Sequence, residues 1–269
     1  MKVLMIGAGN MGFTFAEGLV ASSIIKKGNL LIYDKSPELR EKLSDDDRFR
    51  IFEELEPALL MTHIIFIAVK PHHAEDLFAE MKPHLHKDQI VVSLMAGVTL
   101  DFIENATGLP KVVRAMPNLP AKVGKGVTAF TETKDVSKIE QITIRSLLDS
   151  TGVAIHVENE TFINKSTAIS GSGPAYVFYF MQSMFEAARK MGFSVNDSKV
   201  LISNTFEGAV QLFKDSSLSP EGWIDRVASK GGTTEAAIDS MKDNNVSAKI
   251  KEAAYAAFER AVELGQETK

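Results

Sequence analysis

The fold of this chain is decided near its start by a glycine-rich segment, Gly7-Ala8-Gly9-Asn10-Met11-Gly12. It follows the apolar run Val3–Ile6 and opens a helical pattern. The glycine spacing alone is a weak signal, but a strand before it and a helix after it are the context of a dinucleotide-binding turn. Gly7 permits the tight turn, Gly9 lets a pyrophosphate approach the backbone, and Gly12 lets the helix pack closely on the strand. An ordinary strand-to-helix turn is the alternative.

Working outward from this segment, short apolar runs alternate with helical patterns through the first half of the chain. This alternation predicts a doubly wound α/β Rossmann-type domain with a mainly parallel sheet over residues 1–160. The expected strands are Val3–Ile6, Leu30–Tyr33, Ile64–Val69, Ile90–Leu94 and Val112–Ala115, with two more at Gly126–Thr131 and Val153–Val157. The expected helices are Asn10–Ser23, His73–Met81 and Val136–Ser150.

The strand signal stops after about Glu160, so residues 161–269 are expected to form an all-α C-terminal dimerisation domain. Apolar residues at helical spacing predict helices at Pro174–Met191, Asp197–Lys214, Thr233–Lys242 and Ala248–Leu264. Pro220 and the Gly231-Gly232 pair interrupt the series. The first of these helices is apolar over a broad face that one neighbouring helix could not bury, which favours an obligate dimer. A monomeric bundle is the alternative.

Composition excludes several classes of protein. The 269 residues carry a formal net charge of −5 with no basic run, which argues against nucleic acid or a lipid surface as partner. Cysteine is absent, so disulfides, thiolate metal sites and cysteine nucleophiles are excluded. The adjacent His72 and His73 have no obvious acidic partner, and no metal site is expected. With no room for a signal peptide and no apolar run of about 20 residues, we expect a cytoplasmic protein.

The residue expected to read the ribose of a dinucleotide is Asp34, which ends the second predicted strand. An acidic side chain at this place binds the ribose 2′-hydroxyl of NAD. Lys35 and Ser36 follow at once and Arg40 lies a turn further on, and these donors could instead hold a 2′-phosphate with Asp34 turned away. A purely structural Asp34 in a turn is a third interpretation. The choice between NADH and NADPH therefore stays open.

Further cofactor residues are expected where other strands end on the same edge of the sheet. Lys70, in Ala68–Pro71, is suited to a cofactor phosphate or ribose, although a solvated lysine is an equal alternative. Asn118 lies in a loop stiffened by two prolines, which is either a cofactor contact or a fixed crossover. The expected cofactor residues are Ile6, Gly7, Ala8, Gly9, Asn10, Met11, Gly12, Asp34, Lys35, Ser36, Ala68, Val69, Lys70, Pro71, Met95, Ala96 and Asn118.

Two further segments combine glycines and hydroxyls at predicted helix starts. Ser170-Gly171-Ser172-Gly173-Pro174-Ala175-Tyr176 suits either a small anion or a plain helix cap with proline in the first turn. Ser229-Lys230-Gly231-Gly232-Thr233-Thr234 offers a second helix start stripped of side-chain bulk. A plain cap needs one hydroxyl, so the second segment is the better candidate for binding an anion.

With these segments in view, the chain resembles the Δ1-pyrroline-5-carboxylate reductase family. The matching segments cover nearly the whole chain in the family's order and spacing, and SGSGPAY with GGTT is far more specific than the glycine turn. They are GAGNMG (Gly7–Gly12), AVKPH (Ala68–His72), RAMPNLPAKVGKGVTA (Arg114–Ala129), SGSGPAYVF (Ser170–Phe178) and SKGGTTEAA (Ser229–Ala237). Lys230, where many members have proline, and Asp34, where many carry a small or hydroxyl residue, depart from the pattern.

The resemblance implies reduction of the cyclic imine to L-proline, the last step of proline biosynthesis, with hydride from NADPH or NADH. It implies that backbone N–H groups of Gly231, Gly232 and Thr233 hold the substrate carboxylate, and that Thr234 is catalytic through a hydrogen bond to the ring nitrogen. The Ser170–Gly173 segment would form the wall beside the nicotinamide. The implied substrate-binding residues are Ser172, Gly173, Ser229, Gly231, Gly232, Thr233 and Thr234.

The resemblance also implies a homodimer whose active site is shared between subunits, and it leaves a higher oligomer open. Two other functions are weighed against the reductase. A 3-hydroxyacid dehydrogenase would use a helical lysine with an asparagine one turn on, whereas Asn164-Lys165 has the reverse order. A non-catalytic nucleotide sensor would be expected to lose the GGTT turn or the SGSG segment, and this chain keeps both.

Overall fold

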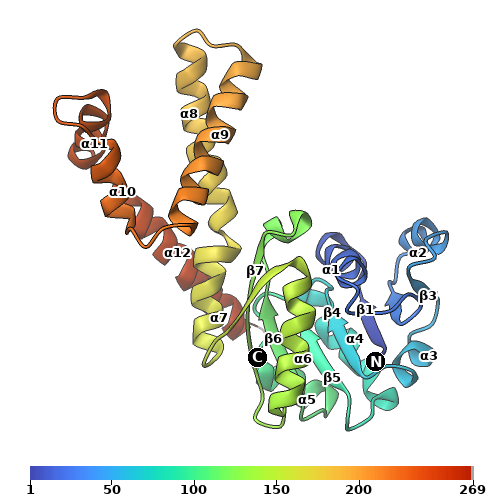
Figure 1. The fold of residues 1–269 in the computed structure, drawn as a ribbon. Helices are drawn as coiled ribbons and strands as arrows, with labels where there is room; N and C mark the ends of the chain where they lie inside the picture. The colour runs from blue at the N-terminus through green and yellow to red at the C-terminus, as the bar shows by residue number, and fades with distance from the viewer. Residues whose placement is uncertain (268–269) are drawn as a thin grey trace. The chain divides into compact units, whose positions relative to one another are not determined.

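The structure is a computed structural model that describes residues 1–267. Its described residues form one eight-stranded sheet in the order β3-β2-β1-β4-β5-β6-β7-β8 (Figure 1). Each central strand is a short, continuous apolar run, as expected of parallel strands covered on both faces. The strands are β1 (Val3–Ile6), β2 (Leu30–Tyr33), β3 (Arg50–Phe52), β4 (Ile64–Ile67), β5 (Ile90–Ser93), β6 (Val112–Met116), β7 (Gly126–Glu132) and β8 (Gly152–His156).

Helices connect these strands and then make up the C-terminal part of the chain (Figure 1). The α-helices are α1 (Asn10–Ala21), α2 (Pro37–Ser44), α3 (Leu55–Leu60), α4 (Ala74–Met81), α5 (Leu100–Thr107), α6 (Lys138–Leu148), α7 (Glu160–Ser166), α8 (Gly173–Lys190), α9 (Val195–Lys214), α10 (Pro220–Val227), α11 (Thr233–Asp243) and α12 (Val246–Glu267). Shorter helical turns are η1 (Pro71–His73), η2 (Lys82–His84), η3 (Leu119–Val123), η4 (Asp149–Thr151) and the π-helix η5 (Thr167–Gly171).

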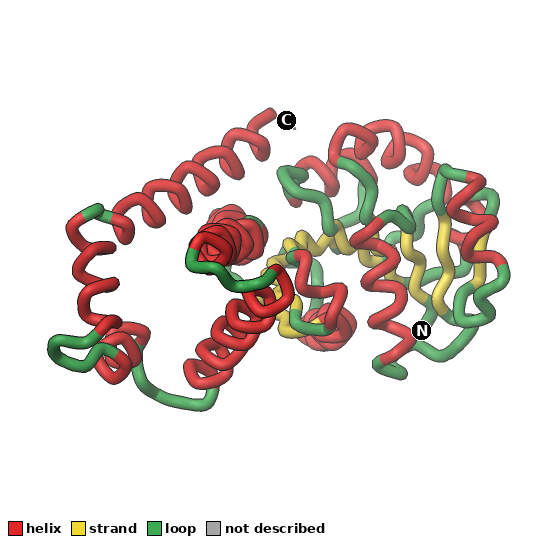
Figure 2. The backbone as a smooth tube through the Cα atoms, turned by 90° about the horizontal axis from the view of Figure 1, so that it is seen from above, coloured by secondary structure: helices red, strands yellow, loops and turns green. Residues whose placement is uncertain are grey.

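Neighbouring strands pair in parallel except β6 and β7, which are antiparallel. Strand order 3-2-1-4-5-6 is that of the doubly wound dinucleotide-binding fold, and it reverses direction between β1 and β4. Helices cover both faces of the sheet (Figure 2). Ligands of such sheets bind at the carboxyl ends of the strands where the strand order reverses. This topology therefore places a binding site at the carboxyl ends of β1 and β4.

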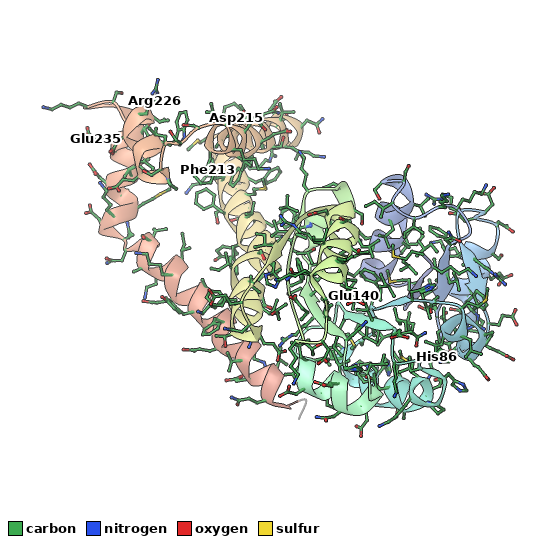
Figure 3. The ribbon with its side chains drawn as sticks, turned by 60° about the horizontal axis from the view of Figure 1, so that its bottom comes forward. His86, Glu140, Phe213, Asp215, Arg226 and Glu235 are labelled. Atoms are coloured by element: carbon green, nitrogen blue, oxygen red, sulfur yellow. The ribbon has the colours of Figure 1, made fainter. Side chains whose placement is uncertain are left out.

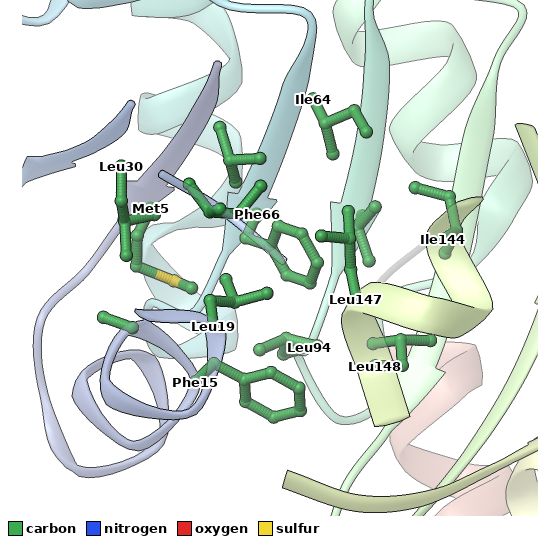
Figure 4. Close-up of a cluster of buried hydrophobic side chains, with 14 of the residues drawn as sticks. Met5, Phe15, Leu19, Leu30, Ile64, Phe66, Leu94, Ile144, Leu147 and Leu148 are labelled. Carbon is green, nitrogen blue, oxygen red and sulfur yellow. The ribbon is translucent and has the colours of Figure 1, made fainter. Parts of the chain in front are cut away.

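The core of the α/β part consists of two apolar layers, one on each face of the sheet. On one face, Phe15 and Leu19 of α1 and Leu147 of α6 are fully buried with Phe66 of β4 (Figure 4). On the other face, α3, α4 and α5 bury Leu59, Phe78 and Ile103 against the sheet. These layers hold the ends of β1, β2, β4 and β5 in a fixed arrangement.

The chain divides into two compact units. The first contains residues 1–174 together with the end of α12 from Ala256, and the second spans Ala175–Tyr255. Within the first unit, Leu264 of α12 lies against Gly97, where a Cβ would be 3.2 Å from the Leu264 carbonyl oxygen. The division at residue 160 expected from the sequence stays a prediction. Within residues 1–267, no helix is both long and apolar enough to cross a membrane.

The sequence correctly predicted the seven longer strands and the long helices, with ends that differ by at most three residues. It missed α2, β3 and α3 between Pro37 and Leu60, and also α5 and α7, because these elements are short and β3 is only partly buried. Pro220 was expected only to interrupt the helical series, but it begins α10, where its missing N–H costs nothing. Pro174 lies in the first turn of α8, as expected, but Ser170 and Gly171 do not form a free helix start. Ser170 lies inside η5, which continues α7.

Candidate functional site

A cavity of about 950 Å³ lies at the carboxyl ends of β1, β2, β4 and β5. This is the edge and switch point that the strand order selects, and the volume lies within the range of cofactor sites. Most of the residues predicted for cofactor binding line it. They are Ile6, Gly7, Gly9, Asn10, Met11, Asp34, Lys35, Ser36, Ala68, Val69, Lys70, Pro71, Met95 and Ala96.

The three glycines of the first turn have different surroundings. Gly7 has φ +92°, and a Cβ there would lie 2.9 Å from the Ala68 carbonyl oxygen. A Cβ at Gly12 would overlap the carbonyl oxygen of Gly7. At Gly9, by contrast, a Cβ would meet no atom of the described residues within 4 Å. Gly7 and Gly12 therefore serve close packing, while Gly9 leaves the cavity open beside the backbone.

Helix α1 begins beside this open space. Gly9 is its N-cap and provides no side-chain cap, and the first turn contains no acidic residue. The first N–H groups of a helix have no partner within it, and the helix dipole places partial positive charge there. The space at Gly9 and the uncapped helix start together fit the pyrophosphate of a dinucleotide.

Asp34 lies at the end of β2 and is held from two sides. Its Oδ2 accepts the Ala8 N–H at 2.6 Å, and its Oδ1 accepts the Ser36 N–H at 2.9 Å. Arg40 donates from Nη1 to the carbonyl oxygens of Asp34 at 2.6 Å and Lys35 at 3.2 Å. Asp34 is thus a turn residue that also lines the cavity, whereas Arg40 braces the turn and is not among the lining residues. The contact of Asp34 with a ribose stays a prediction.

The 2′-phosphate interpretation depends on the two residues after Asp34. Lys35 and Ser36 both line the cavity. The Ser36 hydroxyl also accepts the Leu39 N–H at 3.3 Å as the N-cap of α2, with Pro37 at the first helical position. A second helix start therefore faces this end of the cavity with a lysine beside it.

Some lining residues were not predicted from the sequence: Tyr33, His73, Asp76, Leu77 and Leu94. Tyr33 ends β2 and Leu94 follows β5, so the rule that sites form at strand ends could have found both. Burial raises the pKa of the Tyr33 phenol, and the nearby carboxylates of Glu80 and Asp34 raise it further against the lowering effect of Arg40. The other three lie on or beside the first turn of α4, where nothing local in the sequence marks them.

Three predicted cofactor residues lie outside this cavity. Ala8 lines a smaller hollow of about 360 Å³ together with Lys42 and Lys122, and Gly12 is buried in α1. Asn118 is only 8% exposed. Its Nδ2 donates to the Ser170 carbonyl oxygen at 3.0 Å, and its Oδ1 accepts the Val127 N–H at 2.9 Å.

The SGSGPAY segment begins in the π-helix η5 and ends in α8. The Ser172 N–H donates to the Thr167 carbonyl oxygen at 2.8 Å, five residues back. The Ser170 hydroxyl bonds to the Ser166 carbonyl oxygen and hydroxyl, each at 3.0 Å. The Ser172 N–H and the Ser170 hydroxyl are therefore bonded within the helix rather than free for an anion.

The GGTT segment lies in the second unit and begins α11. Gly231 has φ +72°, a conformation that favours glycine, and Gly232 is the N-cap of the helix. The Gly231 N–H donates to Glu235 Oε2 at 2.6 Å, and the Gly232 N–H donates to the Ser229 carbonyl oxygen at 2.9 Å (Glu235 is labelled in Figure 3). The hydrogen bonds described within residues 1–267 give the Thr233 and Thr234 N–H groups no partner. Thr233 and Thr234 thus provide the uncapped first turn of α11.

The fold, the glycine-rich turn Gly7–Gly12 and the cavity define a class of protein, the nicotinamide-dinucleotide-dependent oxidoreductases. Residues 2–97 match the family model for "NADP oxidoreductase coenzyme F420-dependent". Residues 160–264 match the model for "Pyrroline-5-carboxylate reductase dimerisation".

Similar proteins make the assignment more specific. The pyrroline-5-carboxylate reductase of Pseudomonas aeruginosa is 33% identical over 99% of this chain and 97% of its own length. A solved pyrroline-5-carboxylate reductase structure from Coxiella burnetii has a TM-score of 0.91 at 31% identity and covers 98% of both chains. The Plasmodium falciparum pyrroline carboxylate reductase, solved with NADP bound, has a TM-score of 0.88 at 29% identity with the same coverage. The chain belongs to the pyrroline-5-carboxylate reductase family.

Proposed function

We propose that this chain reduces L-Δ1-pyrroline-5-carboxylate to L-proline with NADPH or NADH, as the last step of proline biosynthesis. The observation that carries the proposal is the match over the full chain to reductases of this name, combined with a cavity that fits a dinucleotide at the predicted residues. A bound nicotinamide would supply a hydride to the imine carbon, and the ring nitrogen would gain a proton. The C=N double bond thereby becomes the single bond of proline.

In this proposal the first unit holds the cofactor. The start of α1 and Gly9 bind the pyrophosphate, and Asp34, Lys35 and Ser36 contact the adenosine ribose or its 2′-phosphate. Both Asp34 oxygens already accept backbone N–H groups, while Lys35 brings a cation to the same end of the cavity. Because these features favour different cofactors, either NADPH or NADH fits this end of the cavity.

The second unit supplies the substrate-binding turn. The Thr233 and Thr234 N–H groups and the Thr233 hydroxyl at the start of α11 hold the substrate carboxylate, and the Thr234 hydroxyl forms a hydrogen bond with the ring nitrogen. A hydride transfer of this kind needs alignment and electrostatic stabilisation, with no protein nucleophile. Within this unit, Ser229, Gly231 and Gly232 shape the turn. Ser172 and Gly173 of the first unit stay predicted substrate contacts. Glu235 and the Ser229 carbonyl oxygen fix the two glycines rather than leave their N–H groups to the substrate.

We also propose a homodimer with the active site shared between subunits. The second unit, taken by itself, exposes large apolar side chains: within α8, Phe178 is 60% and Tyr179 76% exposed, and none of the described residues of α8 is buried. Phe213 of α9 is 51% exposed (labelled in Figure 3). Large apolar side chains that are exposed in the single chain favour an interaction site on these helices. The match of residues 160–264 to a dimerisation model supports both the dimer and a helical domain over 161–269.

The proposed activity is tested by loss of reduced-nicotinamide absorbance when the purified protein is mixed with pyrroline-5-carboxylate. We expect turnover, with L-proline formed in equal amount to the cofactor oxidised. The same assay with NADH and NADPH side by side decides the cofactor preference. A 3-hydroxyacid substrate serves as the control, because solved 3-hydroxyisobutyrate dehydrogenase shares the fold at 13% identity. Cofactor binding without imine turnover, or turnover of the hydroxyacid alone, would refute the proposal.

A further inference from the structure

The π-helix η5 lies between α7 and α8, directly before Ser172 and Gly173. A π-helical turn is rare and recurs at functional sites, because it replaces regular hydrogen bonds with wider ones. Here the wide bond runs from the Ser172 N–H to the Thr167 carbonyl oxygen at 2.8 Å.

Pro174 explains why an outside partner is needed at Ser170. In a regular α-helix the carbonyl oxygen of Ser170 would accept a hydrogen bond from the N–H four residues later. That residue is Pro174, which has no N–H to donate. The side-chain amide of Asn118 takes its place and donates to this oxygen at 3.0 Å.

Asn118 is well fixed for this purpose. It follows β6 as the residue that precedes η3, and two prolines, Pro117 and Pro120, flank it. Its Oδ1 accepts the Val127 N–H of β7 at 2.9 Å, so both ends of the amide are in use and the side chain cannot rotate freely. The amide thus ties η5 to the sheet.

A second contact anchors the preceding helix. Arg114 of β6, 3% exposed, donates to Glu160 Oε1 at 2.6 Å and to Asn164 Oδ1 at 3.0 Å, both on α7. The Glu160 carboxylate also accepts the Leu100 N–H at 3.0 Å. Because β6 therefore holds α7 through Arg114, Asn118 determines only where the chain goes after α7.

From this arrangement we propose that Asn118 is a positioning residue for the reaction. It replaces the N–H that Pro174 lacks, and so fixes the π-turn that presents Ser172 and Gly173 to the substrate. Asn118 then acts on substrate alignment without touching the cofactor. The inference rests on the proposed function in one respect, namely that Ser172 and Gly173 line the substrate pocket.

The test uses the full-length protein with Asn118→Asp, Pro174→Ala and the double variant. Aspartate keeps the acceptor for Val127 and replaces the donor to Ser170 with an oxygen. We expect kcat/KM for pyrroline-5-carboxylate to fall about tenfold through kcat, the equivalent of 1.4 kcal/mol, while the Kd of the cofactor changes less than about twofold. Pro174→Ala alone is the matched control and stays within about twofold of the wild type.

The double variant gives the sharpest result. An alanine at position 174 restores an N–H four residues after Ser170, so it should recover most of the activity lost in Asn118→Asp. A kcat/KM that does not recover, or a cofactor Kd that rises as much as kcat/KM falls, would overturn the proposal. The second outcome would make Asn118 a cofactor contact.

Amide hydrogen exchange provides a readout that needs no turnover. The Ser172 amide should exchange about tenfold faster in Asn118→Asp, a change that corresponds to a weaker local structure, and slow again in the double variant. If Asn118→Asp does not fold, Asn118→Ser serves instead, since its hydroxyl is too short to reach Ser170. Unchanged exchange at Ser172 refutes the positioning role. A wild-type protein that fails to reduce the imine refutes the proposed function alone.

Discussion

Gly9 and Gly12 lie three residues apart in the same turn, yet alanine at each should have opposite effects. At Gly12 a Cβ would overlap the Gly7 carbonyl oxygen and lie 3.1 Å from the Ala68 Cβ. Both obstacles are fixed, because one is backbone and the other belongs to the residue that follows β4. Overpacking of this kind costs about 3 kcal/mol or more, and the better helix propensity of alanine offsets about 1 kcal/mol of it.

Gly12→Ala should therefore lower the free energy of unfolding by at least about 2 kcal/mol. For a unit of this size, that corresponds to a fall in Tm of about 4–8 °C. Gly9→Ala should leave stability within about 0.5 kcal/mol, because φ −67° and ψ −169° suit any residue and no described atom lies within 4 Å of the added Cβ.

Gly9→Ala, which should leave stability nearly unchanged, should instead weaken the binding of the cofactor. Its added methyl group would project where the pyrophosphate must approach, and we expect NADPH or NADH to bind at least about tenfold more weakly, that is by about 1.4 kcal/mol. Thermal unfolding measures the change in stability, and fluorescence titration of the reduced cofactor measures the change in cofactor affinity. The reasoning is refuted if Gly9→Ala binds cofactor like the wild type, or if it is as unstable as Gly12→Ala.

Three further predictions concern the second unit, the dimer and the response to pH. Thr234→Ala should lower kcat/KM about tenfold to a hundredfold, roughly 1.4–3 kcal/mol for a lost hydrogen bond to a charged group; wild-type kinetics in a folded variant would contradict it. Phe178→Asp should weaken the dimer by at least about 2 kcal/mol, seen as monomer by analytical ultracentrifugation, and an unchanged dimer would place the interface elsewhere. Burial raises the pKa of Glu140, but hydrogen bonds from Lys111 at 2.7 Å and from Ser137 outweigh burial and lower it. Stability from this carboxylate is thus present above its unfolded pKa and lost as pH falls through the folded one. Glu140→Gln should cost about 1 kcal/mol at neutral pH and nothing in acid, measured by urea unfolding at both pH values, and a cost that persists in acid would refute the linkage.

Much of the fold and of the cofactor cavity could be predicted from the sequence, because the signals are local. Val3–Ile6 and Ile64–Ile67 are buried runs of four apolar residues, and Gly12 is constrained by the Gly7 carbonyl oxygen within the same turn. Strand ends in a parallel sheet meet at one edge, so the lining segments Ala68–Pro71 and Met95–Ala96 follow from topology. Short elements such as β3 escaped prediction because three residues, none of them fully buried, carry little pattern.

Only the tertiary structure decided how the remaining polar groups are used. The place of Asn118 after a strand left open a cofactor contact or a fixed crossover, and the structure shows that its amide donates to Ser170, which lies 52 residues away in sequence. The SGSGPAY segment looked like a helix start, but α7 runs into it through a π-turn. Hydrogen-bond partners so far apart in sequence leave no periodicity or spacing that a reader of the chain could detect. The sequence therefore determined where the cofactor cavity forms, and the folded chain determined which polar groups remain free for a ligand.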